Sequence, residues 1–561
     1  MIRRRRTVAI ALIAATAVAL SACGTASTTT PSPTALAASV NDVNPVDRDQ
    51  LVDGGTLQWA LGATVSNFNY YNINGAQTDT FTIATALLPR PFHYSAAGET
   101  SVNTDYFTSI EVTEEDPLTI TYTVNPKAVW SDGKPVGADD FAGMWKANNG
   151  SDPAYQGWGT TGYDQIASVA PGAEQGQVVV TYATRFADWP SLFDPLIPAS
   201  LTATPAAFND SWAQAPLVTA GPFVWGGEDK TAKTYTLNRN PAWWGDQAKL
   251  DSIVFRAYAD PSAAAGAFRT GQLDVAEILP DADQYRAAKE LPDVTVRTAG
   301  SPVFRMFTFN KADALLSDEN VRKAVILGVD RARMASLMVG KIGGAAEALQ
   351  NHIFMPNQTG YAENCGDLCR YDPEAAKKLL TSAGWTLGKD GYFVKDGTTL
   401  ELSITVQSGR SNSANEAQIA QSTLKEAGIK LDIRTVPVDD FFTKYVTVGN
   451  FQLATWTWNG VAMPVSGSLS MYTLDEQNIQ QNYGRGGSEE INDLLHSAVQ
   501  ATTPEKENEL ANQADAALWA DASWLPLYQV PQNTAVRSTV GNLGSPGFAD
   551  VRFQDIGFTE K

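Results

Sequence analysis

The chain has 561 residues, which is more than one hydrophobic core can organise, so several domain-sized units are expected. Its composition, 43% hydrophobic and 18% charged, is typical of a globular protein. The formal net charge of −20 argues against a nucleic-acid partner and against attraction to anionic lipid, since both need a basic surface.

The N-terminus has the features of a bacterial lipoprotein signal. Residues 1–6 read MIRRRR, and residues 7–20 form an uncharged apolar run that is shorter than the roughly 20 residues needed to span a bilayer. The sequence LSACG over 20–24 resembles a lipobox, in which the cysteine is acylated and begins the mature chain. We therefore predict a signal peptide over 1–22, lipidation of Cys23, and anchoring to the outer face of the cytoplasmic membrane. The alternative is a cleaved secretory peptide that leaves a free cysteine.

A flexible tether is expected to follow the lipidated cysteine. Residues 24–40 are rich in Ser, Thr, Pro and Ala, and they contain no charge and no amphipathic period. We assign residues 23–53 to the lipidated cysteine and tether, and we expect the folded body to begin near Gly54.

The first half of the body mixes strands with short helices. Alternating or β-branched runs bounded by Gly, Pro and Asp predict strands at 56–60, 118–124, 177–182, 235–238 and 252–258. Helices are predicted at 261–270 and at 141–148, the latter with Asp139 as its N-cap and the Asp139–Asp140 pair in solvent. This order indicates a mixed α/β or α+β fold and no repeat architecture.

The second half contains a βαβ unit. Asp372 followed by Pro373 predicts a helix start, and Gly384 its C-terminal end. A hairpin is predicted over 391–400 on the turn at residues 396–397. A strand at 402–406, a helix at 413–427 and a strand at 429–436 then form a unit that is expected to be parallel and right-handed.

A further strand is predicted in FQLATWTWNG, residues 451–460. The spacing of two places Trp456 and Trp458 on one face of that strand. A long polar loop is expected from Asn459 to about Tyr483, where it would meet a ligand bound at the carboxyl ends of the strands.

Cys365 and Cys369 are expected to form a disulfide, the default for paired cysteines outside the cytoplasm. A zinc site is the alternative, but it would need two more ligands, and the three histidines of the chain form no cluster. No metal and no cofactor are expected.

Motifs of covalent catalysis are sparse. The chain contains no GxSxG, GxxxxGK[ST] or GxGxxG. Residues 131–134 spell SxxK, but that chemistry needs the serine at the start of a helix, whereas SDGKP predicts a turn, and no KTG follows. We therefore predict that the chain is not an enzyme, with an SxxK hydrolase or transferase as the remote alternative.

Several short segments together resemble the family 5 extracellular solute-binding proteins of ABC importers, the peptide, opine and nickel type. The resemblance runs from about Gly54 to the C-terminus and suits the lipobox. Its segments are WSDGKP at 130–135 with ADD at 138–140, AGPF at 220–223, LNRNPAWW at 237–244, GQLD at 271–274, FN at 309–310, NVRKA at 320–324, DR at 330–331 and the helix at 375–384.

The resemblance implies a two-lobed fold like that of periplasmic binding proteins, with the ligand cleft between the lobes. Lobe I is expected to comprise 54–299 and 530–561, with an extra subdomain at about 87–204, and lobe II to comprise 300–529. The chain would cross between the lobes near 300–301 and 528–529, and closure around a ligand would occur there.

The resemblance also directs attention to Asn459. Peptide-binding members often show W-x-x-D at this strand, and their aspartate pairs with the α-ammonium of the peptide. Counted from Trp456, the fourth position here is Asn459, which carries no charge. This departure puts peptides with a free amine in doubt and leaves room for a blocked peptide, a sugar-like or glycolipid ligand, or another acid in the same role.

Other residues are expected near the ligand for simpler reasons. Phe68, Asn69 and Tyr70 follow the first strand, where the first loop of the family borders the cleft. Trp158 lies in a loop, and Arg485 could pair with a ligand carboxylate, with a surface arginine as the alternative. The full set of candidate ligand residues is Asn459, Trp458, Trp456, Phe68, Asn69, Tyr70, Trp158 and Arg485.

The predicted function is that of a lipid-anchored substrate-binding protein. It would capture a solute, most readily an oligopeptide, act as a monomer and deliver the solute to ABC permease subunits in the membrane. The alternative is an envelope receptor or regulator of the same fold that binds a glycolipid or a signal.

Overall fold

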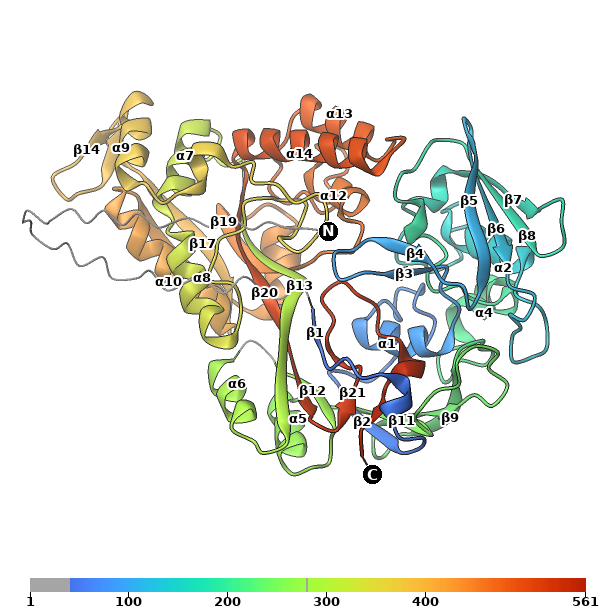
Figure 1. Ribbon diagram of the computed structural model, residues 1–561. Coiled ribbons are helices and arrows are strands. Elements are labelled where there is room, and N and C mark those ends of the chain that lie inside the picture. The colour runs from blue at the N-terminus through green and yellow to red at the C-terminus, as the bar shows by residue number, and fades with distance from the viewer. Residues whose placement is uncertain (1–40, 279–280, 561) are drawn as a thin grey trace, which may run out of the picture. The chain divides into compact units, whose positions relative to one another are not determined.

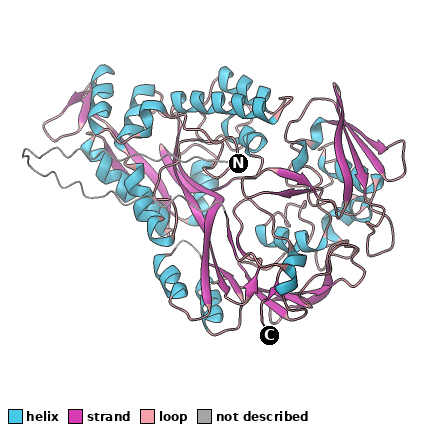
Figure 2. Cartoon of the chain, in the orientation of Figure 1, coloured by secondary structure: helices cyan, strands magenta, loops and turns pink. Residues whose placement is uncertain are grey.

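The computed structural model describes residues 41–278 and 281–560. It is built on one ten-stranded sheet (Figure 2). In sheet order its strands are β18 (Lys430–Val436), β17 (Glu401–Gln407), β19 (Leu453–Asn459), β13 (Val294–Phe309), β20 (Trp524–Arg537), β12 (Val275–Glu277), β2 (Thr56–Leu61), β11 (Ser252–Ala257), β10 (Thr234–Arg239) and β9 (Phe223–Asp229).

The two central strands, β13 and β20, are much longer than the others and run antiparallel side by side (Figure 1, green and red). Their ladder is interrupted between Gly300 and Phe304. Side chains bridge the interruption: Ser301 Oγ donates to the Val530 carbonyl at 2.6 Å, and Gln529 Nε2 donates to the Ser301 carbonyl at 2.7 Å. The backbone groups freed by the irregularity therefore keep partners.

We use the names lobe I and lobe II for the divisions 54–299 with 530–561 and 300–529. In lobe I the main hydrophobic cluster joins β2, β9, β10 and β11 to a second sheet in the order β5-β6-β8-β7. Its remaining elements are α1 (Thr78–Leu87), β3 (Phe92–Tyr94), β4 (Thr100–Val102), β5 (Phe107–Glu115), β6 (Leu118–Val124), α2 (Ala138–Asn148), β7 (Ile166–Pro171), β8 (Gln177–Tyr182), α3 (Ala199–Thr202), α4 (Pro205–Asp210), α5 (Pro261–Arg269) and α6 (Ala282–Lys289).

In lobe II the side chains of the central strands β13, β19 and β20 enter hydrophobic clusters on both faces of the sheet. Leu453 belongs to the cluster formed with α7, α8, α9 and α10, whereas Ala454 and Trp456 belong to the cluster formed with α12, α13 and α14. The helices are α7 (Glu319–Gly328), α8 (Arg331–Met338), α9 (Pro373–Ser382), α10 (Ser411–Glu426), α11 (Val438–Asp440), α12 (Pro464–Tyr472), α13 (Glu489–Ala498) and α14 (Pro504–Asp521).

Short strands complete the structure. The hairpin predicted at 391–400 forms β15 and β16, and Asp396 and Gly397 both have positive φ in its turn. The short strands are β14 (Thr386–Leu387), β15 (Phe393–Lys395), β16 (Thr398–Thr399), β21 (Val540–Gly541), β22 (Gly544–Ser545) and β23 (Gly557–Phe558).

Most predicted elements are present. The strands at 56–60, 118–124, 177–182 and 252–258 appear as β2, β6, β8 and β11. The predicted βαβ unit appears as β17, α10 and β18, with parallel strands. Asp372 caps α9 by accepting a hydrogen bond from the Ala375 amide at 2.8 Å.

Three expectations need correction. The folded chain starts before Gly54, because β1 (Asp42–Val43) pairs with β22 and Val52 bridges to Phe558, so the tether cannot extend to residue 53. Residues 1–40, which hold the predicted signal peptide and Cys23, lie outside the described residues. The polar loop after Asn459 contains the helix α12, which was not predicted because three serines and a glycine at 464–472 have low helix propensity.

The third correction concerns the acidic pair before α2. Gly137, not Asp139, is the N-cap, and Asp140 is buried instead of solvated. Asp140 accepts hydrogen bonds from the Gly137 amide at 2.9 Å, the Ala199 amide at 2.7 Å and the Trp130 indole at 3.0 Å. The carboxylate thus joins three segments of lobe I.

Beneath β13 and β19, lobe II holds a buried ion pair. Arg305 Nε and Nη2 donate to the two oxygens of Glu416 at 2.8 and 2.7 Å, and Glu416 is fully buried. Burial by itself would lower the pKa of Arg305, but Glu416 more than offsets this and raises it. Arg305 also donates to Thr457 Oγ1 at 2.9 Å, so the pair fixes β19 against β13.

Replacing Glu416 with alanine is expected to lower the free energy of unfolding by about 3–5 kcal/mol, because Arg305 would remain buried without its partner. Glu509→Ala is the control, since Glu509 pairs with Lys506 in a largely exposed position. Denaturant unfolding measures both. An equal effect of the two substitutions would contradict the role of the buried pair.

Candidate functional site

The end of β19 lies at the carboxyl edge of the sheet in lobe II. Asn459 is its last residue, is exposed, and pairs with Val303, beside the interruption of β13. The Gly460 amide then donates to the Pro302 carbonyl at 2.9 Å. Because β17 and β18 run parallel to β19, their carboxyl ends are at the same edge. Asn459 therefore stands where the chain passes between the lobes.

Part of β19 has a strand on one side only. Its ladder with β13 extends from Leu453 to Asn459, but its ladder with β17 comprises only Leu453 and Ala454. Among the described strands, none pairs with the outer edge of β19 from Thr455 to Asn459. Such an edge can accept an extended chain as an added strand.

Trp456 and Trp458 share one face of β19, as predicted, and it is the face opposite Asn459. They are 6% and 8% exposed and stack in the aromatic part of the lobe II core with Phe442, Tyr483 and Phe304. The Trp458 indole N–H is buried without a hydrogen-bond partner. Packing accounts for both rings, and the free N–H of Trp458 is the polar group that a ligand could use.

Two of the candidates in lobe I are core residues, which corrects their assignment. Phe68 is 3% exposed and packs edge-on against Trp225 and Tyr235. Asn69 is fully buried. Its side-chain Nδ2 donates to the backbone carbonyl of Phe208 at 2.8 Å, and its side-chain Oδ1 accepts from the backbone amide of Tyr71 at 3.1 Å. Neither side chain presents a surface to a ligand.

Tyr70 and Trp158 have a different position. Trp158 is 52% exposed, and its ring lies 6.2 Å from that of the half-buried Tyr70. Tyr70 in turn lies 4.9 Å from Phe81. Ile73, 61% exposed, follows Asn72, which forms a β-bridge with Gly157. Exposed large apolar side chains gathered in this way are suited to contact a ligand.

Arg485 is separated from Asn459, which corrects its place in the same site. Its guanidinium donates to the carbonyls of Tyr483 at 2.9 Å and Thr447 at 3.2 Å. The neighbouring Gly484 bonds to Lys311, just beyond the end of β13 that pairs with Leu453. The length of β19 therefore separates Arg485 from Asn459, a distance of roughly 20 Å.

Contacts between the lobes surround the edge at Asn459. In lobe I the turn between β3 and β4 carries Ala97, whose carbonyl accepts from the Thr359 amide at 3.1 Å. Glu99 Oε1 accepts from Thr359 Oγ1 at 2.8 Å. Gly98 faces the Ala462 carbonyl so closely that a Cβ atom would lie 2.9 Å from it. Sequence periodicity gives no signal for such contacts, because they join segments far apart in the chain.

A second group of contacts joins the segment before Trp189 to lobe II. The Ala187 amide donates to the Val499 carbonyl at 2.6 Å, and Arg185 Nε donates to the Ala501 carbonyl at 2.9 Å. Ser466 at the start of α12 donates its amide to Asp188 at 2.8 Å. The subdomain of lobe I is thus in direct contact with α12 and with the segment before α14.

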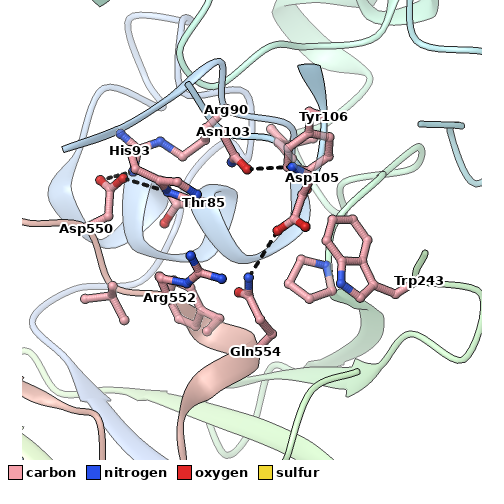
Figure 3. A pocket seen from close by; sticks show the side chains of 14 residues that line it. Thr85, Arg90, His93, Asn103, Asp105, Tyr106, Trp243, Asp550, Arg552 and Gln554 are labelled. Carbon is pink, nitrogen blue, oxygen red and sulfur yellow. Dashed lines mark hydrogen bonds and ion pairs between the residues drawn. The ribbon is translucent and has the colours of Figure 1, made fainter. Parts of the chain in front are cut away.

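A small polar pocket lies within lobe I, away from β19 (Figure 3). Asp105, Gln554 and Trp243 line one side, and Asp550 with His93 lines the other (Figure 3). Its cavity volume of about 30 Å³ is too small for a peptide. The pocket therefore does not compete with the lobe junction as a solute site.

The other motifs have structural roles. Cys365 and Cys369 are joined in a disulfide. Ser131 Oγ accepts a hydrogen bond from the Thr219 amide at 3.1 Å, while Lys134 lies 3.3 Å from Asp132, so the SxxK residues do not form a Ser–Lys pair. Within the described ranges there is no cluster of three or more potential metal ligands, and no helix has the length and apolarity to cross a membrane.

Comparison with known families identifies the fold. The family described as bacterial extracellular solute-binding proteins, family 5 Middle, matches residues 101–480. The chain belongs to this family. Its two-lobed architecture agrees with that assignment.

Two curated relatives indicate the range of the family. The oligopeptide-binding protein OppA of Mycobacterium tuberculosis (strain H37Rv) is 38% identical over 531 residues, covering 93% of this chain and 88% of OppA. A probable monoacyl phosphatidylinositol tetramannoside-binding protein of the same strain, LpqW, is 28% identical over 352 residues, covering 57% of this chain and 54% of LpqW.

Solved structures show the same fold. The periplasmic EDTA-binding protein EppA superposes with a TM-score of 0.83 at 24% identity and covers 94% of this chain. The oligopeptide-binding protein AppA from Bacillus subtilis, solved with a nonapeptide, superposes with a TM-score of 0.71 at 17% identity and covers 91% of this chain. Both of those chains are covered in full.

Replacing Gly98 with valine is expected to separate the lobes, because the added Cβ would meet the Ala462 carbonyl. Small-angle scattering should then give a larger radius of gyration than for the unmodified protein. Gly133→Val is the matched control: Gly133 has a similar φ, +84° against +82°, but nothing lies within 4 Å of its Cβ position. An unchanged radius for Gly98→Val would show that this contact does not hold the lobes together.

Proposed function

We propose that this chain is the substrate-binding lipoprotein of an ABC importer for oligopeptides. It would capture a peptide between lobe I and lobe II and deliver it to permease subunits in the membrane. The observation that carries the proposal is the 38% identity to OppA over nearly the whole of both chains. In this proposal lobe I comprises 54–299 with 530–561 and lobe II comprises 300–529, and the lobes would close around the peptide by bending at the interruption of β13.

The geometry at β19 supports a peptide ligand. The edge from Thr455 to Asn459 has no strand partner in the described sheet, so its backbone groups can pair with an extended peptide. The exposed side chain of Asn459 stands at the end of that edge. Trp158 and Tyr70 would supply an apolar wall from lobe I. Backbone pairing of this kind tolerates many peptide sequences.

The second candidate function is binding of a mannosylated lipid. The relationship to LpqW favours it, although that alignment covers little more than half of each chain. Asn459 also favours it, because an amide both donates and accepts hydrogen bonds and suits a neutral polyol better than an ammonium group. A protein of this kind would act as an envelope receptor or regulator.

Tryptophan fluorescence tests the two functions directly. The purified protein is titrated with a pool of short random peptides and, separately, with monoacyl phosphatidylinositol mannosides. Saturable quenching or enhancement by peptides alone supports the oligopeptide function. A response to the mannosides alone would replace that function with the second.

Replacing Asn459 with aspartate is expected to increase affinity for peptides with a free amine by about tenfold or more over their N-acetylated forms. The physical reason is the charge-assisted hydrogen bond that a carboxylate adds for the ammonium. Asn478→Asp is the control, since Asn478 is exposed elsewhere in lobe II. Equal affinity of both peptide forms for Asn459→Asp would remove Asn459 from the ligand site.

Replacing Cys23 with serine is expected to move the protein from the membrane fraction to the soluble fraction, because the acyl chains would be lost. Fractionation of cells followed by immunoblotting measures this. Ser27→Ala in the same segment serves as the control and should stay with the membrane. Retention of Cys23→Ser on the membrane would contradict the lipid anchor.

A further inference from the structure

Two carboxyl groups from different lobes face one another where the subdomain contacts lobe II. Asp188, in lobe I, is 5% exposed and accepts the Ser466 amide of lobe II at 2.8 Å. Glu507 lies in the first turns of α14 in lobe II, and its Oε1 is buried. Arg185, three residues before Asp188, donates to the carbonyls of Ala501 and Thr502 just before α14, so the segment of Asp188 lies against the start of the helix that carries Glu507.

No cation neutralises this pair in the part of the chain that the structure describes. Arg185 is on the same segment as Asp188, but its guanidinium donates hydrogen bonds to the carbonyls of Ala501 and Thr502 and forms an ion pair with Glu115. Lys506 pairs with Glu509 on the outer side of α14.

Tyr94 of β3 is the other titratable group near Asp188. Its hydroxyl donates to the Pro190 carbonyl at 3.5 Å. Burial is the main cause that raises the pKa of the Tyr94 hydroxyl, and the charge of Asp188 is a smaller cause in the same direction. Tyr94 therefore stays neutral and offers no charge to the pair. None of Arg185, Lys506 and Tyr94 therefore gives the pair of carboxyl groups a positive partner.

An ionised carboxylate accepts hydrogen bonds and donates none. With both groups ionised, Glu507 Oε1 has no partner and faces a like charge. One added proton converts this repulsion into a carboxyl–carboxylate hydrogen bond. Burial, followed by the nearby charge of Asp188, accordingly raises the pKa of Glu507 from its ordinary 4.5 to about 9.

We propose that Asp188 and Glu507 form a proton-dependent latch that holds the two lobes together. The inference rests on the proposed function in one respect, that the lobes open and close around a solute. Opening would separate the two side chains and return each to water, where both ionise. Closing at neutral pH would then take up a proton, which Glu507 holds in the closed form.

The pH dependence of closure follows from this uptake of a proton. The stabilisation of the closed form by the shared proton is fully present below about pH 4.5 and is lost progressively up to about pH 9. At neutral pH part of this stabilisation is already lost, so the latch favours closure of the empty protein less than it does in acid. A bound solute must supply the missing interaction, and the closed form then reports that the protein is loaded.

The test measures the distance between the lobes without any ligand. Nitroxide labels on Ala173→Cys in the subdomain and Ala516→Cys on the exposed side of α14 report this distance by pulsed electron resonance. In otherwise unmodified protein the ratio of closed to open molecules should fall by up to about tenfold per pH unit between 4.5 and 9. In Glu507→Gln it should stay constant and high, since the amide donates to Asp188 without a proton.

Two further variants make the result specific. Asp188→Asn keeps an acceptor for the Ser466 amide and should also abolish the pH response. This second variant decides the question if Glu507→Gln does not fold. Glu509→Gln, on the same helix but exposed, should respond like the unmodified protein. A closed population that is independent of pH in the unmodified protein overturns the latch, as does an unchanged response in Glu507→Gln.

A peptide titration at pH 5 separates this inference from the proposed function. There the latch favours closure, so peptides should bind at least as well as at neutral pH. Absence of peptide binding at pH 5 rejects the oligopeptide function, whereas the distance measurement still decides the latch by itself.

Discussion

The antiparallel pairing of β13 with β20 carries one sheet from lobe I into lobe II. On its outer side β13 pairs with β19, in lobe II, and on its outer side β20 pairs with β12, in lobe I, so the strands of both lobes join the same central pair. The longer of the two irregularities in this ladder, between Gly300 and Phe304, separates its two halves, and a second register shift follows between Arg305 and Met306. Side-chain bonds from Ser301 and Gln529 keep it ordered. The position of the lobe junction, and of everything placed around it, follows from this pair.

The candidate site is organised by the two faces of β19. Its aromatic face closes the core of lobe II, while its other face holds Thr455 and Thr457 against Arg305 and ends in the exposed Asn459. The proposed recognition residue, Asn459, therefore lies at the end of a strand whose body is fixed by a buried ion pair. The contacts that surround this point come from lobe I, so the site and the junction between lobes are one region. The proposed latch of Asp188 and Glu507 makes the closing of that region dependent on pH.

Elements with a local signal could be predicted from the sequence. The period of two in LTITYTV, the Asp372-Pro373 start of α9 and the Asp396-Gly397 turn each depend on neighbouring residues alone, and each is present. The alternation along β19 also placed both tryptophans on one face.

Features that depend on packing could not be predicted from local sequence in this way. Asn69 and Phe68 look like cleft residues in sequence and are core, Asp140 looks solvated and is buried, and Arg485 is close to Asn459 in sequence terms but lies at the other end of the strand. The meeting of Asp188 with Glu507 has no sequence signal, because more than three hundred residues separate them.

Native mass spectrometry of the protein purified from its own host distinguishes the oligopeptide function from the binding of a lipid. The protein should carry a mixture of short peptides, seen as a heterogeneous mass increase that is lost on unfolding, and the released peptides can be sequenced. A single mass increase that corresponds to a mannosylated lipid would contradict the oligopeptide function.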